Sequence, residues 1–333
     1  MKRTSIQFLL SMLTIWLTVP AFAEIASFND NEDQSIIDIG GYDVPVKKGG
    51  LYDRYRSNPP LSVIQQESPK TDLSWFKTLE KTKVDIGFES YSPNFYYENS
   101  KVTVIYTADL ERLKSLMPQS VLNEVQPLQV WPGRGLVALT AYAYHYCDND
   151  SYNEISLAVV TGEPGSVNLG PLSLVGQAIA KDFWGYVLKL PVDTELARVR
   201  GIVGYNLPKW LTPINYFDGK EFLKFEVKDQ ATGKVDFVLQ ANRLEDISEE
   251  PVLVNNSFTN VDANGKVTVG NAVTRMMKHG VSMDDEDIYL SLTNGSFSSF
   301  IKSLDLGAMV RYEYVPSFQS ALYAPTELAI TKR

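Results

Sequence analysis

Short runs in which apolar and polar residues alternate dominate the chain from about residue 84 onward. A period of two is typical of strands that bury one face. The runs predict strands at 102–106, 136–147, 153–160, 185–190, 195–203, 222–227, 235–240 and 308–314. Thr232-Gly233 and Asn264-Gly265 have the chemistry of hairpin turns. Apolar residues at helical spacing indicate short helices at 110–117, 172–179 and 296–304. We therefore expect an α+β fold, a mainly antiparallel β barrel or cone with a few short helices.

The N-terminal end has a different pattern. Lys2 and Arg3 precede an apolar run at 6–19, and Ala21-Phe22-Ala23 follows it. This order is typical of a secretory signal peptide. We expect residues 1–23 to be removed by cleavage after Ala23, which predicts a periplasmic or secreted protein. An uncleaved anchor is the alternative, although the run is shorter than the about 20 residues of an ordinary membrane span.

Residues 24–77 form a second distinct stretch, with polar runs, loop signals and apolar pieces at 36–39 and 42–46. We interpret this stretch as a partly ordered arm on the surface of a domain that spans 78–333. The net charge of −9 disfavours nucleic acid or an anionic membrane as a partner. One cysteine, Cys147, excludes an internal disulfide. The chain has only two histidines, which are far apart in sequence and together with one cysteine do not make a zinc site, so we expect no metal. Nucleotide-binding and hydrolase motifs are missing, and we expect no cofactor.

The strongest chemical signal is a lysine that follows a proline. The predicted strand 195–203 leads into Gly204-Tyr205-Asn206-Leu207-Pro208-Lys209-Trp210. A lysine held against apolar neighbours loses solvation of its ammonium form, so the pKa of such a group falls and a nucleophilic amine becomes available. Lys209 is therefore a candidate for imine formation with a carbonyl compound.

Glu154 is the second candidate. It alternates with Ser156, Ala158 and Val160 on one face of the strand 153–160. That face is either the solvent side of an ordinary strand or the wall of a cavity in which small neighbours leave room for a substrate.

These residues resemble the acetoacetate decarboxylase family, whose signature is a Tyr-Pro-Lys-Lys sequence after a glycine-containing strand. The spacing from Gly185-Tyr186 to Pro208-Lys209 follows the family pattern without a gap, and Tyr152-Asn153-Glu154 matches the family's Tyr-Thr-Glu. The similarity covers roughly residues 95–325 in scattered blocks. It implies that Lys209 forms the imine and that Glu154 lies in the active site. It also implies the fold of the family and the absence of a cofactor.

The chain departs from the family at several positions. Trp210 stands where the family has a second lysine, and Thr140 where it has a second acid. The family's arginine ahead of the first strand is missing, and Lys101 is the nearest cation. Residues 161–184 form an insert that is either a lid or a subunit contact. With Trp210 at its position, we expect apolar surroundings rather than a second cation to activate the amine.

We place Trp210, Tyr205, Thr140 and Tyr106 in the substrate pocket. The resemblance then predicts a cofactor-independent decarboxylase of a β-keto acid that releases carbon dioxide through a lysine imine, in a homo-oligomer. Other imine chemistry on a keto acid, such as an aldol or dehydration step, is the first alternative. A non-catalytic periplasmic binding protein on the same fold is the second, because a fold does not determine a function.

Overall fold

The structure is a computed structural model that describes residues 33–328. The expected signal peptide, 1–23, and the first part of the arm, 24–32, lie outside the described residues. From Gln34 onward the chain forms one unit, so the rest of the arm belongs to the same body as the barrel. Within residues 33–328, no helix is both long and apolar enough to cross a membrane.

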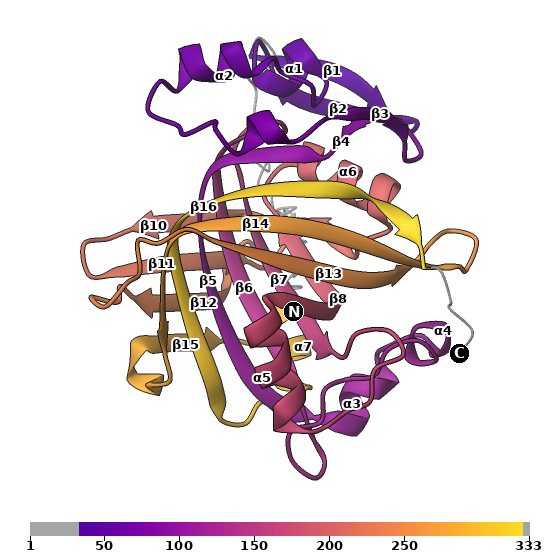
Figure 1. Ribbon diagram of the computed structural model, residues 1–333, viewed down its shortest axis with the longest axis vertical. Coiled ribbons are helices and arrows are strands. Elements are labelled where there is room, and N and C mark those ends of the chain that lie inside the picture. Colours follow the sequence, from indigo (N-terminus) through magenta and orange to yellow (C-terminus); the bar gives the residue numbers. More distant parts are fainter. Residues whose placement is uncertain (1–32, 329–333) are drawn as a thin grey trace, which may run out of the picture. The chain divides into compact units, whose positions relative to one another are not determined.

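Seven long strands close into a barrel (Figure 1). Antiparallel pairing joins them in the order β13-β14-β16-β5-β6-β7-β8, and a parallel pairing of β13 with β8 completes the ring. The barrel strands are β5 (Asn94–Asp109), β6 (Arg134–Cys147), β7 (Tyr152–Thr161), β8 (Asp182–Val192), β13 (Val252–Val261), β14 (Val267–Ser282) and β16 (Met309–Glu327). The predicted α+β, mainly antiparallel barrel is therefore confirmed. Several strands are longer than their alternating runs, because bulges interrupt the alternation within β5, β14 and β16.

A second sheet packs on the outside of the barrel. Its strands are β10 (Ile214–Asp218), β11 (Phe222–Lys228), β12 (Val235–Asn242) and β15 (Ile288–Leu292). Outward side chains of the barrel such as Val104 and Ile155 pack with Phe225 and Phe237 of this sheet, and α7 (Ser296–Lys302) joins the same apolar core. The largest apolar core thus lies between the barrel wall and the outer sheet, which leaves the inward face of the barrel free to line a cavity.

The predicted strand 195–203 is wrong: this segment is the helix α6 (Glu195–Tyr205). The Thr194 side chain caps its first turn by accepting a hydrogen bond from the Ala197 N–H at 3.3 Å. At its end Asn206 takes a left-handed conformation with φ of 49°. Leu196, Val199 and Val203 recur at helical spacing and pack together in one apolar cluster, so the helical period overrides the apparent alternation.

The remaining elements are short. They comprise α3 (Leu110–Ser115), α4 (Gln119–Leu122), α5 (Pro171–Ala180), β9 (Lys209–Leu211) and the 3-10 turn η2 (Asp285–Asp287). The helices predicted at 110–117, 172–179 and 296–304 correspond to α3, α5 and α7. Of these elements, β9 matters most for the site, because it pairs with β8 in parallel and begins at Lys209.

The N-terminal segment 34–92 is well structured and covers the end of the barrel near α6 (Figure 1). It contains β1 (Gln34–Ile39), β2 (Tyr42–Lys47), α1 (Leu51–Tyr55), α2 (Leu61–Glu67), η1 (Phe76–Thr78), β3 (Thr82–Asp85) and β4 (Glu89–Ser92). The extended pieces expected at 36–39 and 42–46 are β1 and β2, which form a hairpin. The sequence analysis did not predict α1 and α2.

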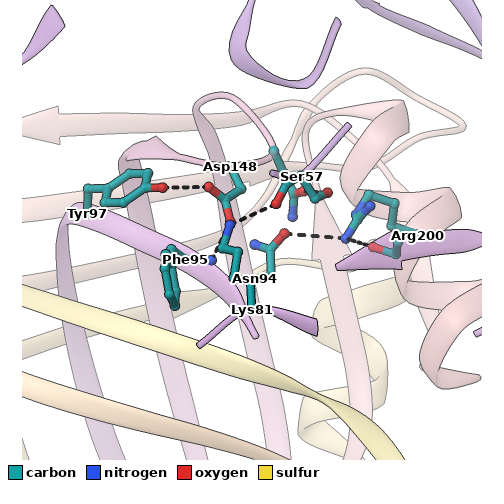
Figure 2. Close-up of polar contacts among 9 residues, drawn as sticks. Ser57, Lys81, Asn94, Phe95, Tyr97, Asp148 and Arg200 are labelled. Carbon is teal, nitrogen blue, oxygen red and sulfur yellow. Dashed lines mark hydrogen bonds and ion pairs between the residues drawn. The ribbon is translucent and has the colours of Figure 1, made fainter. Parts of the chain in front are cut away.

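Buried charges tie this segment to the barrel (Figure 2). Asp148, in the turn after β6, is fully buried and pairs with Lys81, whose ammonium also donates to the Ser57 carbonyl at 2.8 Å. The carboxylate of Asp148 accepts two further hydrogen bonds, from the Phe95 N–H at 2.6 Å and the Tyr97 hydroxyl at 2.7 Å. Since removing one partner of a buried pair leaves an uncompensated charge, these contacts hold the segment firmly.

Arg200 makes the equivalent connection from α6. Its guanidinium is buried and donates to Tyr52 at 3.2 Å, to Ser90 at 3.2 Å and to Asn94 at 3.3 Å. Tyr52 and Ser90 belong to the N-terminal segment, so this segment is bonded directly to the helix that leads to Lys209.

Candidate active site

The inward side chains of β5, β6 and β7 form three rows across the barrel wall. Each row contains one residue from each strand, and the strand register places these three residues opposite one another. The reactive row is Lys101, Tyr142 and Glu154; the middle row is Thr103, Thr140 and Ser156; the apolar row is Ile105, Ala138 and Ala158. Residues in successive rows are two positions apart on a strand, or roughly 7 Å. The polarity of the interior therefore decreases from the reactive row to the apolar row.

Lys209 joins the reactive row from β9. Its Nζ lies 2.6 Å from Glu154 Oε2, and the two side chains are only 8% and 9% exposed. The ammonium also faces the ring of Tyr152 at 5.7 Å from its centroid. The pair lines a cavity of about 150 Å³, the reaction cavity, which also includes Lys101 and Tyr142. The face of β7 that carries Glu154 is thus the wall of a cavity and not a solvent face.

Gly201 of α6 makes room for the lysine side chain. A Cβ at this position would lie 2.5 Å from Cε of Lys209, closer than real carbon atoms approach. The helix therefore supports the middle of the Lys209 chain and fixes the direction of its amine. Because the side chain rests on a helix backbone, a methyl group at 201 would displace it.

A second set of charges lies in the same wall. Lys101 Nζ is 3.1 Å from Glu313 Oε1, and Arg311 donates to the other oxygen of Glu313 at 3.2 Å. Burial raises the pKa of Glu313, but its two cationic partners outweigh burial and hold that pKa below the ordinary value. The three groups together carry one positive charge, and Lys209 with Glu154 carries none. The interior as a whole therefore suits a ligand with one negative charge.

Tyrosine hydroxyls surround the lysine pair. Burial, aided by the charge of Glu154, raises the pKa of Tyr142, Tyr144 and Tyr152 well above the ordinary tyrosine value. These phenols therefore stay protonated across the physiological range. Their hydroxyls can orient a ligand by hydrogen bonding, but they cannot act as bases there.

The pocket residues expected from the sequence divide into two pairs. Thr140 lies in the barrel wall, with its hydroxyl 3.1 Å from that of Thr103, and buried Tyr205 lines a small cavity of about 30 Å³ next to Lys209. Trp210 and Tyr106 were misplaced: both side chains pack in the apolar core on the outer side of the barrel. The indole of Trp210 meets the ring of Phe297 edge-on at 5.5 Å. Since neighbours on a strand face opposite sides, Trp210 must point away when Lys209 points inward.

The outward position of Trp210 also corrects the expected mode of activation. The indole does not surround the amine of Lys209, whose partner is the carboxylate of Glu154. The sequence analysis also missed Arg311 and Glu313, although their alternation in the predicted strand 308–314 was a signal that two charges share one face.

Within residues 33–328, no group of three or more histidine, cysteine, aspartate or glutamate side chains is arranged to hold a metal ion. The chemistry that the described residues offer is that of a buried amine, its carboxylate partner, and a cationic wall.

Comparisons with known proteins place the fold. No protein-family model and no curated protein matches the sequence. Among solved structures, an acetoacetate decarboxylase is 13% identical with a TM-score of 0.50, over 72% of this chain and 91% of that one. The acetoacetate decarboxylase of Legionella pneumophila is 11% identical with a TM-score of 0.50, over 71% and 87%. The enduracididine biosynthesis enzyme MppR, complexed with pyruvate, is 12% identical with a TM-score of 0.50, over 72% and 91%.

Proposed function

From the acetoacetate decarboxylase fold of this chain, we propose that the protein is an imine-forming enzyme that removes carbon dioxide from a β-keto acid. One observation carries the proposal: the amine of Lys209 and the carboxylate of Glu154 lie 2.6 Å apart, buried, on the wall of the reaction cavity. An ammonium that protrudes into solvent would not need such a partner. A buried amine with an acid–base group beside it is an arrangement suited to covalent catalysis by lysine.

In the first step Glu154 accepts a proton from the ammonium of Lys209. The neutral amine then attacks the ketone carbon of the substrate, which forms a C–N bond and moves the carbonyl electrons to oxygen. One proton then moves from the attacking nitrogen to this oxygen, and Glu154, now protonated, returns its proton to the same oxygen, which leaves as water. The product of this step is a protonated imine, and Glu154 is again a carboxylate.

In the second step the bond between the α carbon and the carboxylate breaks. Its electron pair moves toward the protonated imine nitrogen, carbon dioxide leaves, and an enamine remains. The enamine carbon then takes a proton from solvent water, and water hydrolyses the imine to release the ketone and the Lys209 amine. Lys101 lies beside the pair in the reactive row and suits the role of holding the substrate carboxylate before it leaves.

Other imine chemistry is the second candidate, and two observations favour it. The lysine that follows the nucleophile in the family is replaced by Trp210, which faces the outer core. In addition, MppR, which shares the fold, is complexed with pyruvate, an α-keto acid. An aldol or dehydration step on an α-keto acid would use the same Lys209 imine and the same proton acceptor.

Borohydride trapping tests the proposal. The wild-type protein is incubated with fresh 3-oxobutanoate or with pyruvate, reduced with borohydride, and analysed by intact mass and peptide mapping. We expect one adduct, on Lys209, and none in Lys209→Ala or in Lys209→Arg, because a guanidinium stays protonated. Lys189→Ala, which removes an outward-facing lysine of β8, is the matched control and should retain the adduct.

Glu154→Gln should still give the adduct but slow turnover by roughly 10²–10⁴-fold, the usual scale for an acid–base group. Release of carbon dioxide from 3-oxobutanoate distinguishes decarboxylation from the other imine reactions. An adduct that persists in Lys209→Ala would move the chemistry to another lysine. No adduct in the wild type with any β-keto or α-keto acid would refute the enzyme and favour a binding protein.

A further inference from the structure

The reaction cavity continues into a larger space inside the barrel, the side chamber. The two spaces share Lys101, Tyr142, Ser156 and Phe258 in their walls. The side chamber has a volume of about 190 Å³, against about 150 Å³ for the reaction cavity. A ligand attached to Lys209 therefore has open space beyond the reactive row, in the direction of the apolar row.

Most of the chamber wall is apolar. The apolar row contributes Ile105, Ala138 and Ala158, and Phe258 of β13 faces them. Three charged side chains, Lys101, Arg311 and Glu313, lie in this wall, and both cations pair with the carboxylate of Glu313. Small side chains at 138 and 158 create the space, because larger residues there would fill the interior.

The insert at 161–184 forms one side of the chamber. Its helix α5 contributes Leu174, which packs near Ala138 and lines the space. Gln177 of the same helix donates to the Thr161 carbonyl at 2.7 Å and so fixes α5 to the end of β7. These contacts place α5 at one side of the chamber, as expected if the insert closes the substrate cavity.

The volume of the chamber indicates the size of its occupant. An apolar protein cavity of about 150 Å³ holds one benzene molecule. A chamber of about 190 Å³ thus accepts a phenyl ring or a branched chain of similar size. The four carbons of acetoacetate would occupy the reaction cavity alone and leave this space empty.

We propose that the substrate is an oxo acid with an apolar group about as large as a phenyl ring, which occupies the side chamber while the carbonyl carbon reacts with Lys209. The proposal rests on the proposed function for the position of the carbonyl group. The carboxylate lies at the cationic wall beside Lys101, and the apolar group extends past Ser156 toward Ala158. A two-carbon spacer places the ring at the middle row, roughly 7 Å along β7 from Glu154, with its far edge toward the apolar row.

Matched pairs of oxo acids test the proposal by trapping. The pairs are 3-oxobutanoate with 3-oxo-5-phenylpentanoate, and pyruvate with 2-oxo-4-phenylbutanoate. Burial of a phenyl group predicts half-saturation of the adduct at about 10- to 100-fold lower concentration for the phenyl member. Equal concentrations for both members, or a preference for the small one, would overturn the proposal.

Ala158→Leu tests the location of the ring, because it fills the chamber two rows from the reactive pair. It should abolish the preference for the phenyl member and change the trapping of the small member by less than about twofold. Ala231→Leu, in the exposed turn between β11 and β12, is the matched control and should keep the preference. Equal loss for both members of a pair would show that the ring does not occupy the chamber, provided that thermal unfolding shows both variants folded.

A ligand without a carbonyl separates this inference from the proposed function. Calorimetry compares 5-phenylpentanoate with butanoate on the wild type and on Lys209→Ala. At least tenfold tighter binding of 5-phenylpentanoate, lost in Ala158→Leu, supports the chamber even if no oxo acid is ever trapped, whereas equal binding refutes it. Absence of trapping with intact 5-phenylpentanoate binding would refute the imine chemistry alone.

Discussion

Replacing Gly201 by alanine should disable the amine of Lys209 and lower the stability of the protein. The new Cβ would lie 2.5 Å from Cε of Lys209. Carbon atoms settle at about 3.5–4.0 Å, so Cε must move by roughly 1.0–1.5 Å. The Nζ atom moves with it, away from the carboxylate of Glu154. A misplacement of about 1 Å in a catalytic group costs on the order of 100-fold in rate.

Two opposing effects act on the free energy of unfolding. Alanine is favoured over glycine inside a helix by about 1 kcal/mol, but moving Nζ away from Glu154 separates a buried ion pair at a cost of about 3–5 kcal/mol. We therefore expect Gly201→Ala to lower the free energy of unfolding by about 2–4 kcal/mol. Urea unfolding gives this value, and the rate of borohydride trapping with the best oxo acid reports the position of the amine.

Gly176→Ala is the matched control for this experiment. Gly176 lies in the middle of α5, and a Cβ there would meet nothing within 4 Å. The control gains the same helical preference without a clash, so both stability and trapping should be retained. If Gly201→Ala traps the oxo acid at the wild-type rate, the role of Gly201 as the support of Lys209 is refuted.

Two further predictions concern residues next to the site. Trp210→Ala should lower the free energy of unfolding by about 2 kcal/mol, because the half-buried indole packs on Phe297. The rate of trapping should stay within about threefold of the wild-type rate. A loss of trapping in a folded variant would contradict the outward position of the Trp210 side chain. Burial raises the pKa of Asp193 to about 6, although the Asn153 N–H and side-chain amide donate to its carboxylate at 2.8 and 2.7 Å. Because the folded protein then holds this proton more tightly than the unfolded chain, its contribution to stability is present below about pH 4 and lost as the pH rises through 6. Urea unfolding from pH 4 to 7 should show the wild type losing about 3 kcal/mol relative to Asp193→Asn, and a difference that is constant with pH would refute the assignment.

The barrel and the reactive pair could be predicted from the sequence, because both are encoded by patterns among residues that are close together in the chain. Alternation in β6, β7 and β8 reflects strands that face a core on one side and a cavity on the other. Lys209 and Glu154 were found through short motifs, and their meeting in the cavity follows from the neighbouring positions of β7, β8 and β9 in the sheet.

Other features required information that the alternating pattern does not contain. In α6 small residues such as Gly201 alternate with larger ones, which is the pattern of a strand. The capping residue Thr194 was the local signal of a helix. Trp210 and Tyr106 were assigned to the pocket by motif position, although the parity of each strand places them on the outer face. The ion pair of Lys101 with Glu313 depends on the pairing of β5 with β16, which lie about 200 residues apart in sequence.

The division of the interior between strands has a consequence for how such a protein can diverge. The reactive pair is carried by β7 and β9, whereas the far wall of the side chamber comes from β13 and α5. Mutations at Phe258 or changes in the length of the 161–184 insert would alter which molecules enter, without touching the amine or its carboxylate. Proteins that share this barrel can therefore change their substrate through substitutions in the chamber wall while they keep the same reactive pair.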